Sequence, residues 1–494
     1  MPYVRLPFPA TEQTVEPHNE GGCPTCSAMK PVLKEQAQEH YHLFRYLHMV
    51  AAGELGLPDY YEKLERSLSN LDQPNLIYPV GNATFAHIFP DANDARHYYI
   101  PVEPIIGGDF SALLNLVEDR LVDVVHKLRQ PQSPSDQKEV LLEALDRVAT
   151  VGEASGGSDN GGAAKSGRPG ILKMLGGQKI KLTPAELEAI RYLLLRDKVG
   201  MGILEPLILD TNIEDISCAG LGPIYIEHKV FKALKAAIIF DEFEDLDAFL
   251  RRNSERINKP VTYRRPIVDA TLPDGSRINI VYGSEVSKRG SNFTIRKFAT
   301  TPLSALDIVE SGGANYRMIA YLSIVIEEGM NVFVSGETAS GKTTLLNAIT
   351  NFITPDAKIV TVEDTPELQV PHPNWVREVV RGAAEDGSSV TMFDLLKAAL
   401  RQRPNAILIG EIRGEEGNIA FQAMQTGHAV MATFHAASVE KLIQRITASP
   451  ISVPKSYVDN LNVIVIVSAV KLPTGKIGRR VLSINELFGY DSVT

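Results

Sequence analysis

The chain has 494 residues, of which 44% are hydrophobic and 22% charged, a composition typical of soluble globular proteins. Its 60 acidic and 50 basic residues give a net charge of −10, which argues against a general nucleic-acid coat, since such proteins present a basic face. Three cysteines exclude a disulfide framework and suit a reducing compartment, and the apolar stretches fall short of the about 20 residues that cross a bilayer. We therefore expect a cytoplasmic protein that acts at a membrane only through partners.

Residues 1–150 are predicted to form a mixed, helix-leaning docking region. Apolar residues recur there at intervals of three and four, which predicts helices over Pro31–Ala52, Tyr60–Leu71, Phe110–Arg129 and Gln137–Thr150. Residues 151–175 are predicted to be a flexible linker, because this stretch is rich in Gly, Ser, Asn and Asp and cannot bury enough apolar surface to fold. The linker marks the expected domain boundary.

Residues 176–304 are predicted to form a compact α+β domain. Thr183 is a good N-cap for a helix that runs to about Lys198, since Pro184 takes the first helical position and Glu186 lies three residues after the cap. Short apolar runs broken by turns predict strands, with one helix among them at about Asp245–Ile257. The predicted strands are Ile224–Glu227, Lys235–Phe240, Ile267–Thr271, Arg277–Val281 and Phe293–Lys297.

Residues 305–494 alternate strand and helix patterns, which predicts an α/β domain with a mostly parallel sheet covered by helices. The strongest motif of the chain lies in it, between a predicted strand at Asn331–Ser335 and a predicted helix at Thr343–Phe352. It has the pattern G-x-x-x-x-G-K-T and consists of Gly336, Glu337, Thr338, Ala339, Ser340, Gly341, Lys342 and Thr343, followed by Thr344.

This motif is typical of a loop that binds the phosphates of a nucleotide. The glycines let backbone N–H groups point inward at phosphate oxygens, and the start of the following helix adds partial positive charge. Lys342 is expected to reach the β- and γ-phosphates of ATP, and the Thr343 hydroxyl is expected to ligate Mg²⁺. The alternative is a Gly-rich turn without a ligand, but the strand before and the helix after the loop favour the phosphate site.

Two predicted strands end in carboxylates. The strand at Ala406–Glu411 ends in an acid and resembles a Walker B segment in which Gly410-Glu411 replaces the usual Asp. The strand at Lys358–Val362 leads to Glu363 and, four residues later, Glu367. Because ligands of parallel sheets gather at the carboxyl ends of the strands, both clusters are expected near the phosphate loop, with Glu363 and Glu411 as metal ligands beside Thr343. Alternatively, these acids cap helices or lie solvated in loops.

A third strand pattern, Thr426–His435, ends in a histidine. His435 is a candidate to contact the γ-phosphate, although a His at a strand end is usually structural. Several arginines crowd the same half of the chain, and Arg413 is the catalytic candidate among them, since arginine stabilises the charge that develops in phosphoryl transfer. The ordinary alternative for each is a surface or ion-pair role. The set is Arg377, Arg381, Arg401, Arg403 and Arg413.

Taken together, these segments resemble one known family over residues 180–490. Four blocks occur in order: GETASGKTT at 336–344, TVEDTPEL at 361–368, LRQRPNAILIGEIRGEE at 400–416 and TGHAVMATFHAAS at 426–438. They resemble the secretion and pilus traffic ATPases, the hexameric motors of type II and type IV secretion, type IV pili and the archaellum. The upstream segments IEDISCAG, LPDGSRINI and NFTIRKF also match the family, and the sequences of all these segments are most similar to its archaeal branch.

The resemblance implies a PAS-like domain flexibly joined to a RecA-like ATPase domain, six copies in a ring, and an integral-membrane platform protein as partner. It implies that Glu367 is the general base for water, that Glu411 acts on Mg²⁺ through water, and that His435 is the second His of the family's histidine box. It further implies that Arg277 and Arg296 approach the nucleotide when the two domains close.

The chain departs from the family pattern in three ways. Thr365-Pro366 replaces the Pro-Ile of bacterial members, and family members usually continue beyond the last strand pattern here, so that the C-terminus is expected to be truncated. The tetracysteine zinc site of bacterial assembly ATPases has no counterpart in the C-terminal half. Cys23 and Cys26, by contrast, form a C-x-x-C pair, with His18, His40 and His42 nearby. We expect a surface loop without metal there, with a zinc site and a redox pair as alternatives.

The leading hypothesis is therefore a cytoplasmic, ATP-hydrolysing hexameric motor that exerts force on a membrane platform protein. A nucleic-acid translocase with the same core is one alternative, which the acidic net charge disfavours. A non-hydrolysing, nucleotide-gated scaffold is the other, which the complete set of Lys342, Thr343, Glu367 and Glu411 disfavours.

Overall fold

The structure is a computed structural model, and it describes residues 3–8, 23–50, 56–152, 179–297, 302–381 and 389–489, apart from 82, 92, 106–109, 127, 132–133, 474 and 476. The chain divides into two compact units, residues 1–299 and 300–494. Each unit has its own sheet and its own hydrophobic cores.

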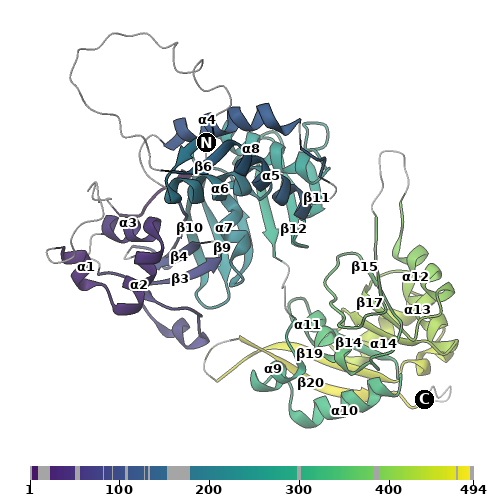
Figure 1. Cartoon of the computed structure of the whole chain (residues 1–494). Helices are drawn as coiled ribbons and strands as arrows, with labels where there is room; N and C mark the ends of the chain where they lie inside the picture. The colour runs from purple at the N-terminus through teal and green to yellow at the C-terminus, as the bar shows by residue number, and fades with distance from the viewer. Residues whose placement is uncertain are drawn as a thin grey trace, which may run out of the picture. The chain divides into compact units, whose positions relative to one another are not determined.

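The N-terminal unit is built on an 11-stranded sheet in the order β11-β12-β13-β8-β9-β10-β5-β4-β3-β2, with β1 paired to β10 (Figure 1). Strands from both sides of the predicted linker belong to this one sheet, because β10 pairs in parallel with β5. The strands are β1 (Tyr3–Val4), β2 (Asp59–Tyr60), β3 (Leu76–Gly81), β4 (Thr84–Phe89), β5 (Tyr98–Val102), β8 (Ile213–Cys218), β9 (Gly222–His228), β10 (Lys232–Phe240), β11 (Ile267–Thr271), β12 (Arg277–Val281) and β13 (Asn292–Arg296).

Three groups of helices accompany this sheet. One group, α1 (Pro24–Ala28), α2 (Pro31–Glu39) and α3 (Tyr41–Met49), shares a core with β3, β4 and β5. A second, α7 (Glu205–Leu209) and α8 (Phe243–Arg256), packs on the strands from β8 to β13. The third shares a core of its own with the parallel pair β6 (Ala149–Val151) and β7 (Ile180–Leu182), and consists of α4 (Phe110–Val125), α5 (Pro134–Val148) and α6 (Pro184–Lys198).

Most predicted elements of this unit are confirmed, including α6 with a capping box in which Thr183 and Glu186 bond each other's backbone N–H groups. The predicted helix at Tyr60–Leu71 is wrong. Only a short 3₁₀ turn forms there, at Arg66–Asn70, and the regularly spaced Tyr61, Leu64 and Leu68 pack from an irregular segment onto the core. The five predicted strands of this unit correspond to β9–β13, and the sequence does not predict the strands β1 to β8.

The C-terminal unit is a seven-stranded sheet in the order β16-β15-β17-β18-β14-β19-β20. All neighbours are parallel except β19 and β20, which confirms the predicted α/β class. The strands are β14 (Val332–Gly336), β15 (Ile359–Glu363), β16 (Trp375–Val379), β17 (Ala406–Ile412), β18 (Ala429–Phe434), β19 (Val463–Lys471) and β20 (Ile477–Glu486).

Helices cover both faces of this sheet, because alternate residues of its central strands enter two different cores. One core joins the sheet to α12 (Met392–Arg401), α13 (Glu416–Gln425) and α14 (Val439–Thr447). The other joins it to α9 (Ala305–Glu310), α10 (Tyr316–Glu327) and α11 (Lys342–Ile349). Among the described helices of either unit, none is long and apolar enough to cross a membrane.

Candidate active site

The loop between β14 and α11 has a backbone that suits an anionic ligand. Ala339 and Gly341 adopt positive φ angles of 60° and 95°, conformations that turn successive N–H groups toward one side. A Cβ at Gly336 would lie 2.2 Å from the carbonyl oxygen of Val467, so that only glycine lets β14 end this close to β19. The predicted strand, loop and helix are therefore present in the predicted order.

Two buried polar groups of this loop have hydrogen-bonding capacity left over for a ligand. The Lys342 side chain is held by the Glu337 carbonyl, 2.9 Å from Nζ, and burial lowers the pKa of Lys342, while the negative charges of Glu411 and Glu367 raise it. The buried Ser340 hydroxyl has no hydrogen-bond partner among the described residues. An incoming phosphate oxygen would satisfy both groups.

The ends of three other strands, β15, β17 and β18, lie along the same edge of the sheet as this loop. The order β15-β17-β18-β14 places the end of β18 beside the phosphate loop and the end of β17 next to it. Ser335 on β14 fixes this geometry, because its hydroxyl donates to the Ala436 carbonyl, 2.7 Å away, directly beyond His435. Glu363, Glu411 and His435 thus come to one edge, as predicted.

Glu411 and His435 connect to Lys342 through a chain of polar contacts. The Glu411 carboxylate lies 3.1 Å from His435 Nε2 and accepts a hydrogen bond of 2.6 Å from Arg413. Because a carboxylate only accepts, Nε2 of a neutral His435 carries the hydrogen, which leaves Nδ1 to face Lys342 Nζ at 3.5 Å. Burial lowers the pKa of His435 despite the opposing effect of Glu411, which favours the neutral ring.

Glu363 is fully buried, and its carboxylate accepts hydrogen bonds from the backbone. Its Oε1 accepts hydrogen bonds of 2.8 Å from the N–H groups of both Glu367 and Leu368, and Oε2 lies 3.7 Å from Arg377 Nε. Burial raises the pKa of Glu363 to about 7, although the two N–H donors and Arg377 lower it. The carboxyl group therefore holds the loop that carries Glu367.

Gly410 explains the departure from the usual Walker B Asp. A Cβ at this position would lie 3.2 Å from Cγ of Glu363 and 3.4 Å from its Cβ, since β15 and β17 are neighbours. A side chain as large as Asp would therefore displace Glu363. The acid of this segment lies one residue later, at Glu411, because Glu363 of the neighbouring strand fills the space at 410.

The sequence comparisons identify the family. The family described as "Type II/IV secretion system protein" matches residues 197–470, more than half of the chain. An uncharacterised protein of Methanocaldococcus jannaschii is 42% identical over 459 residues, which cover 93% of this chain and 82% of that protein. The chain belongs to this family of type II/IV secretion ATPases.

Bacterial relatives match a smaller part. The type IV secretion system protein PtlH of Bordetella pertussis is 34% identical over 228 residues, 41% of this chain and 67% of its own length. Among solved structures, the VirB11 ATPase of Brucella suis is 25% identical, with a TM-score of 0.30 over 57% of this chain and 93% of its own. The pilus retraction motor PilT is 19% identical, with a TM-score of 0.43 over 59% of this chain and 84% of its own. The predicted resemblance is thus confirmed, and it rests on the sequence matches.

Within this secretion ATPase fold, the remaining predicted residues take two kinds of position. Thr343 and Thr344 lie half-buried in the first turn of α11, next to Lys342. Arg277 and Arg296 lie in the other unit, directly opposite each other on β12 and β13, and both are exposed. The structure therefore does not bring these two arginines to the phosphate loop within one unit.

Sequence reasoning missed two residues that brace the site. Asn347 on α11 donates to the Glu367 carbonyl at 3.0 Å and accepts from the Gln369 N–H at 2.9 Å, and so ties the acidic loop to the phosphate-loop helix. Arg479 on β20 donates to the Ala339 carbonyl at 3.2 Å. Asn347 shares a polar face of α11 with Thr343 and Thr344, so that its spacing gives no special signal, and nothing in the sequence singles out Arg479 either.

Proposed function

We propose that this chain is a Mg²⁺-dependent ATPase that works as a hexameric motor for a type IV pilus-like filament, an archaellum or a type II/IV secretion machine. One observation carries the proposal: the buried Lys342 lies between the phosphate loop and the linked side chains of His435 and Glu411. A positive group held in this way suits the phosphates of a nucleotide, and acids beside it suit hydrolysis.

The residues present fit ATP and Mg²⁺. The buried Ser340 hydroxyl and the Lys342 ammonium are available to phosphate oxygens, and the Thr343 hydroxyl opens the same helix. We assign Thr343 and, through water, Glu411 to the metal, as the sequence predicts. Bound Mg²⁺ would neutralise charge on the phosphate oxygens and fix their orientation. Glu363 was also predicted to bind the metal. It suits this role less well than Glu411, because its carboxylate is buried and already accepts hydrogen bonds from two N–H groups.

In this proposal Glu367 accepts the proton of the attacking water. Its backbone N–H is bonded to Glu363 and its carbonyl to Asn347, so that the loop cannot swing freely. Glu363 and Asn347 are thus positioning residues. Arg413 donates a hydrogen bond to Glu411. His435 contacts the same carboxylate and, through its other ring nitrogen, Lys342 at the phosphate loop.

The wider assembly follows from the family. We propose that residues 305–494 form a RecA-like ATPase domain, that residues 176–304 form a PAS-like domain, and that domain closure brings Arg277 and Arg296 to the nucleotide. The partner is proposed to be an integral-membrane platform protein, with the motor on the cytoplasmic side. VirB11 and PtlH are named as proteins of type IV secretion, and PilT as a pilus retraction motor, which supports this kind of role.

Phosphate release from ATP by the purified full chain tests the enzyme proposal. With Mg²⁺ we expect turnover, and we expect Lys342→Ala to lower it at least about 100-fold, since a buried charge on the transferred phosphate is lost. Lys397→Ala, an exposed lysine on α12, is the matched control and should keep wild-type turnover. Nucleotide binding without phosphate release would instead indicate the nucleotide-gated scaffold.

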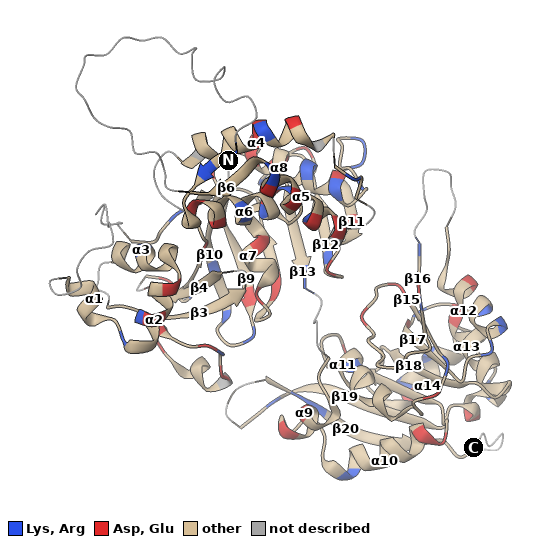
Figure 2. Ribbon diagram, viewed as in Figure 1, with Lys and Arg blue, Asp and Glu red and all other residues tan. Residues whose placement is uncertain are grey.

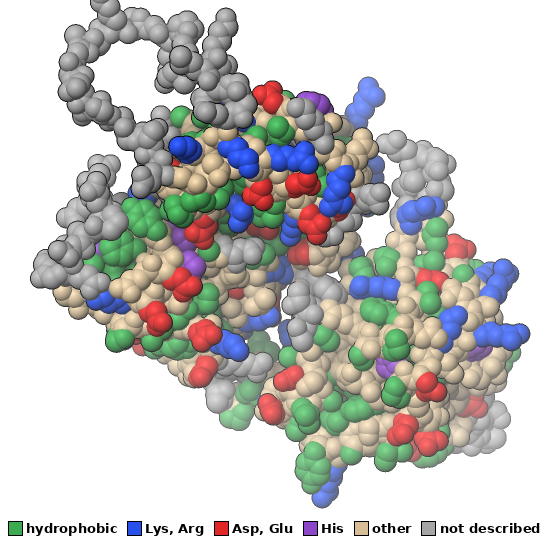
Figure 3. All heavy atoms as spheres, in the orientation of Figure 1, with side chains coloured by type: hydrophobic (Ala, Val, Ile, Leu, Met, Phe, Trp, Pro, Cys, Tyr) green, Lys and Arg blue, Asp and Glu red, His purple; other side chains and the backbone are tan. Residues whose placement is uncertain are grey.

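Stimulation of turnover by DNA would favour the nucleic-acid translocase. Basic and acidic residues are both scattered over the ribbons of the two units (Figure 2), and they lie interspersed over the described surface of each unit on the face seen in Figure 3. We therefore expect no stimulation. Co-purification of a membrane protein and a mass of six chains in solution would support the motor assignment, and a monomer at all concentrations with nucleotide bound would contradict it.

A further inference from the structure

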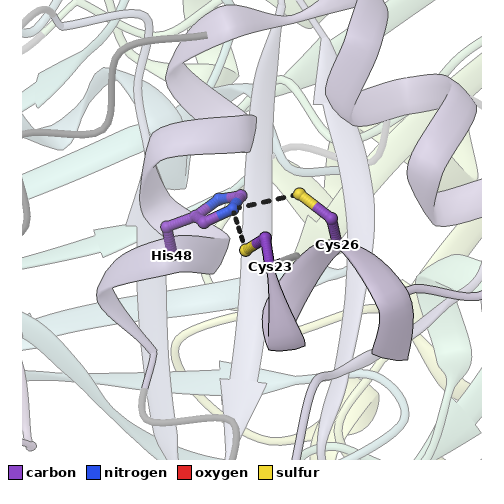
Figure 4. Close-up of side chains that lie close together, drawn as sticks. All are labelled: Cys23, Cys26 and His48. Atoms are coloured by element: carbon purple, nitrogen blue, oxygen red, sulfur yellow. Dashed lines mark hydrogen bonds between the residues drawn. The ribbon is translucent and has the colours of Figure 1, made fainter. Parts of the chain in front are cut away.

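Three potential metal ligands lie close together in the N-terminal unit. Cys23 immediately precedes α1, Cys26 lies on α1, and His48 lies near the end of α3, and their side chains point toward one another (Figure 4). The two sulfur atoms lie 3.5 Å and 3.3 Å from His48 Nε2, and all three ligand atoms lie within 4.8 Å of each other. The prediction of a surface loop at Cys23 and Cys26 is wrong, because Cys26 lies on helix α1 and both Cys26 and His48 are buried.

These separations match a tetrahedral zinc site. Zinc binds thiolate sulfur at about 2.3 Å and imidazole nitrogen at about 2.0–2.1 Å, so that a sulfur and a nitrogen on one tetrahedral ion are about 3.5 Å apart. Two thiolates together with Zn²⁺ form a neutral unit, which can be buried at low cost. A C-x-x-C pair with a distant third ligand is a common arrangement of structural zinc sites.

The orientation of His48 points the same way. Its Nδ1 lies 2.7 Å from the carbonyl oxygen of Phe44, which can only accept a hydrogen bond. Nδ1 therefore carries the hydrogen, and the lone pair of Nε2 is directed at the two sulfurs. One lone pair accepts from a single thiol only, whereas a metal ion satisfies both sulfurs and the nitrogen. A carbonyl that fixes the second nitrogen is usual for a metal-bound histidine.

The local fold explains what such an ion would do. Helix α1 has only five residues, and no side chain caps its start, so that it has little stability of its own. It lies beside α2 and α3, whose apolar side chains share one core with β3, β4 and β5. An ion held by Cys23, Cys26 and His48 would fasten α1 to the end of α3.

We propose that Cys23, Cys26 and His48 bind a structural Zn²⁺ ion that fastens α1 to α3, with water or a further side chain as the fourth ligand. Of the histidines that the sequence suggested, His18 lies outside the described residues. His42 instead bonds the Ala83 carbonyl at 2.7 Å, and His40 packs against His42 and Phe85. The histidine that lies beside the two cysteines is instead His48, 22 residues after Cys26.

Metal analysis of the purified full chain tests this proposal. After expression with added zinc and removal of loose metal by gel filtration, we expect one Zn²⁺ per chain. Cys23→Ser, Cys26→Ser and His48→Ala should each retain less than about a tenth of it, because each removes one of the three protein ligands of the ion. The matched controls are Cys218→Ser, whose thiol is buried and bonded to the Gly220 carbonyl at 3.2 Å, and the exposed His126→Ala. Both should keep the zinc.

Two measurements on the wild-type chain keep the test decisive if a variant does not fold. Cobalt added to the metal-free chain should give the charge-transfer absorption of two thiolate ligands. Blocking thiols with a methanethiosulfonate should release zinc as the first two cysteines react. A chain without stoichiometric zinc and without the cobalt band would overturn the proposal. So would a mass two daltons low, which marks a Cys23–Cys26 disulfide, or full zinc content in the Cys23→Ser and Cys26→Ser variants.

Discussion

Strands β15 and β17 are neighbours that each carry a glutamate at or next to their carboxyl end, yet the two acids differ in almost every physical respect. Glu363 at the end of β15 is fully buried, and one of its oxygens accepts two backbone N–H groups. Glu411 at the end of β17 is partly exposed and bonds two charged or titratable side chains, Arg413 and His435. Position on a sheet edge brings an acid to the site, but burial decides whether it serves the fold or the ligand.

The loop that Glu363 holds gives the largest expected effect. Glu367→Gln should lower turnover by about 100-fold or more, because an amide cannot accept the proton of the attacking water, while ATP binding should change little. Turnover measured by phosphate release and binding measured with a fluorescent ATP analogue separate the two. If this variant hydrolyses ATP at the wild-type rate, the general base lies elsewhere.

Replacement of the exposed acid should have a smaller effect. In Glu411→Gln the side chain keeps its shape but loses the charge that Arg413 and His435 contact, so that we expect turnover to fall by about 10-fold or more with a matching change in the Mg²⁺ requirement. The exposed Glu415→Gln, four residues further along, is the control. Equal turnover in the Glu411→Gln and Glu415→Gln variants would show that Glu411 does not act at the metal site.

Replacement of the buried acid should show itself in stability and its pH dependence. Because the pKa of Glu363 rises from 4.5 to about 7 on folding, its contribution is fully present below pH 4.5 and is lost as pH rises through 7. Glu363→Gln imitates the protonated form. Relative to this variant, the wild type should lose up to about 3 kcal/mol of unfolding free energy between pH 4.5 and pH 8.

Urea unfolding without nucleotide measures this difference, and fluorescence isolates the right unit. The chain has one tryptophan, Trp375 on β16, whose indole N–H donates to Thr361 Oγ1 on β15 at 3.0 Å. Its emission therefore reports on the C-terminal unit alone. Parallel stability curves for wild type and variant over this pH range would show that Glu363 does not titrate as a buried group.

The smallest effect concerns the contact between the two strands. Gly410→Ala places a methyl group 3.2 Å from Glu363 Cγ, which should cost about 1–2 kcal/mol and a several-fold loss of turnover as Glu363 moves. In the background of Glu363→Ala this methyl has room, so that the added cost should largely vanish. Purely additive losses in the double variant would mean that the two side chains do not compete for space.

The sequence predicts the phosphate loop and the three strand ends well, because their chemistry requires particular residue types at short, fixed spacings. The sequence does not predict the burial of Glu363. The N–H groups that donate to its carboxylate lie only four and five residues further along the chain, and such local contacts leave no periodic pattern in the sequence. The missed strands β3 and β5 contain Pro79 and Pro101, residues that argue against a strand. The sequence does not predict the position of His48 either, because only the packing of α3 brings that ring to the cysteines.

The pairing of β5 with β10 has a practical consequence for dissecting the molecule. Strands from the two sides of the 151–175 stretch are neighbours within one sheet, and β6 and β7 pair across the same interval. A protease that nicks the chain there should leave two pieces that stay together through gel filtration. An expressed fragment that begins after this stretch would instead expose the bare side of β10 and tend to aggregate, whereas supplying the missing piece in trans should rescue it.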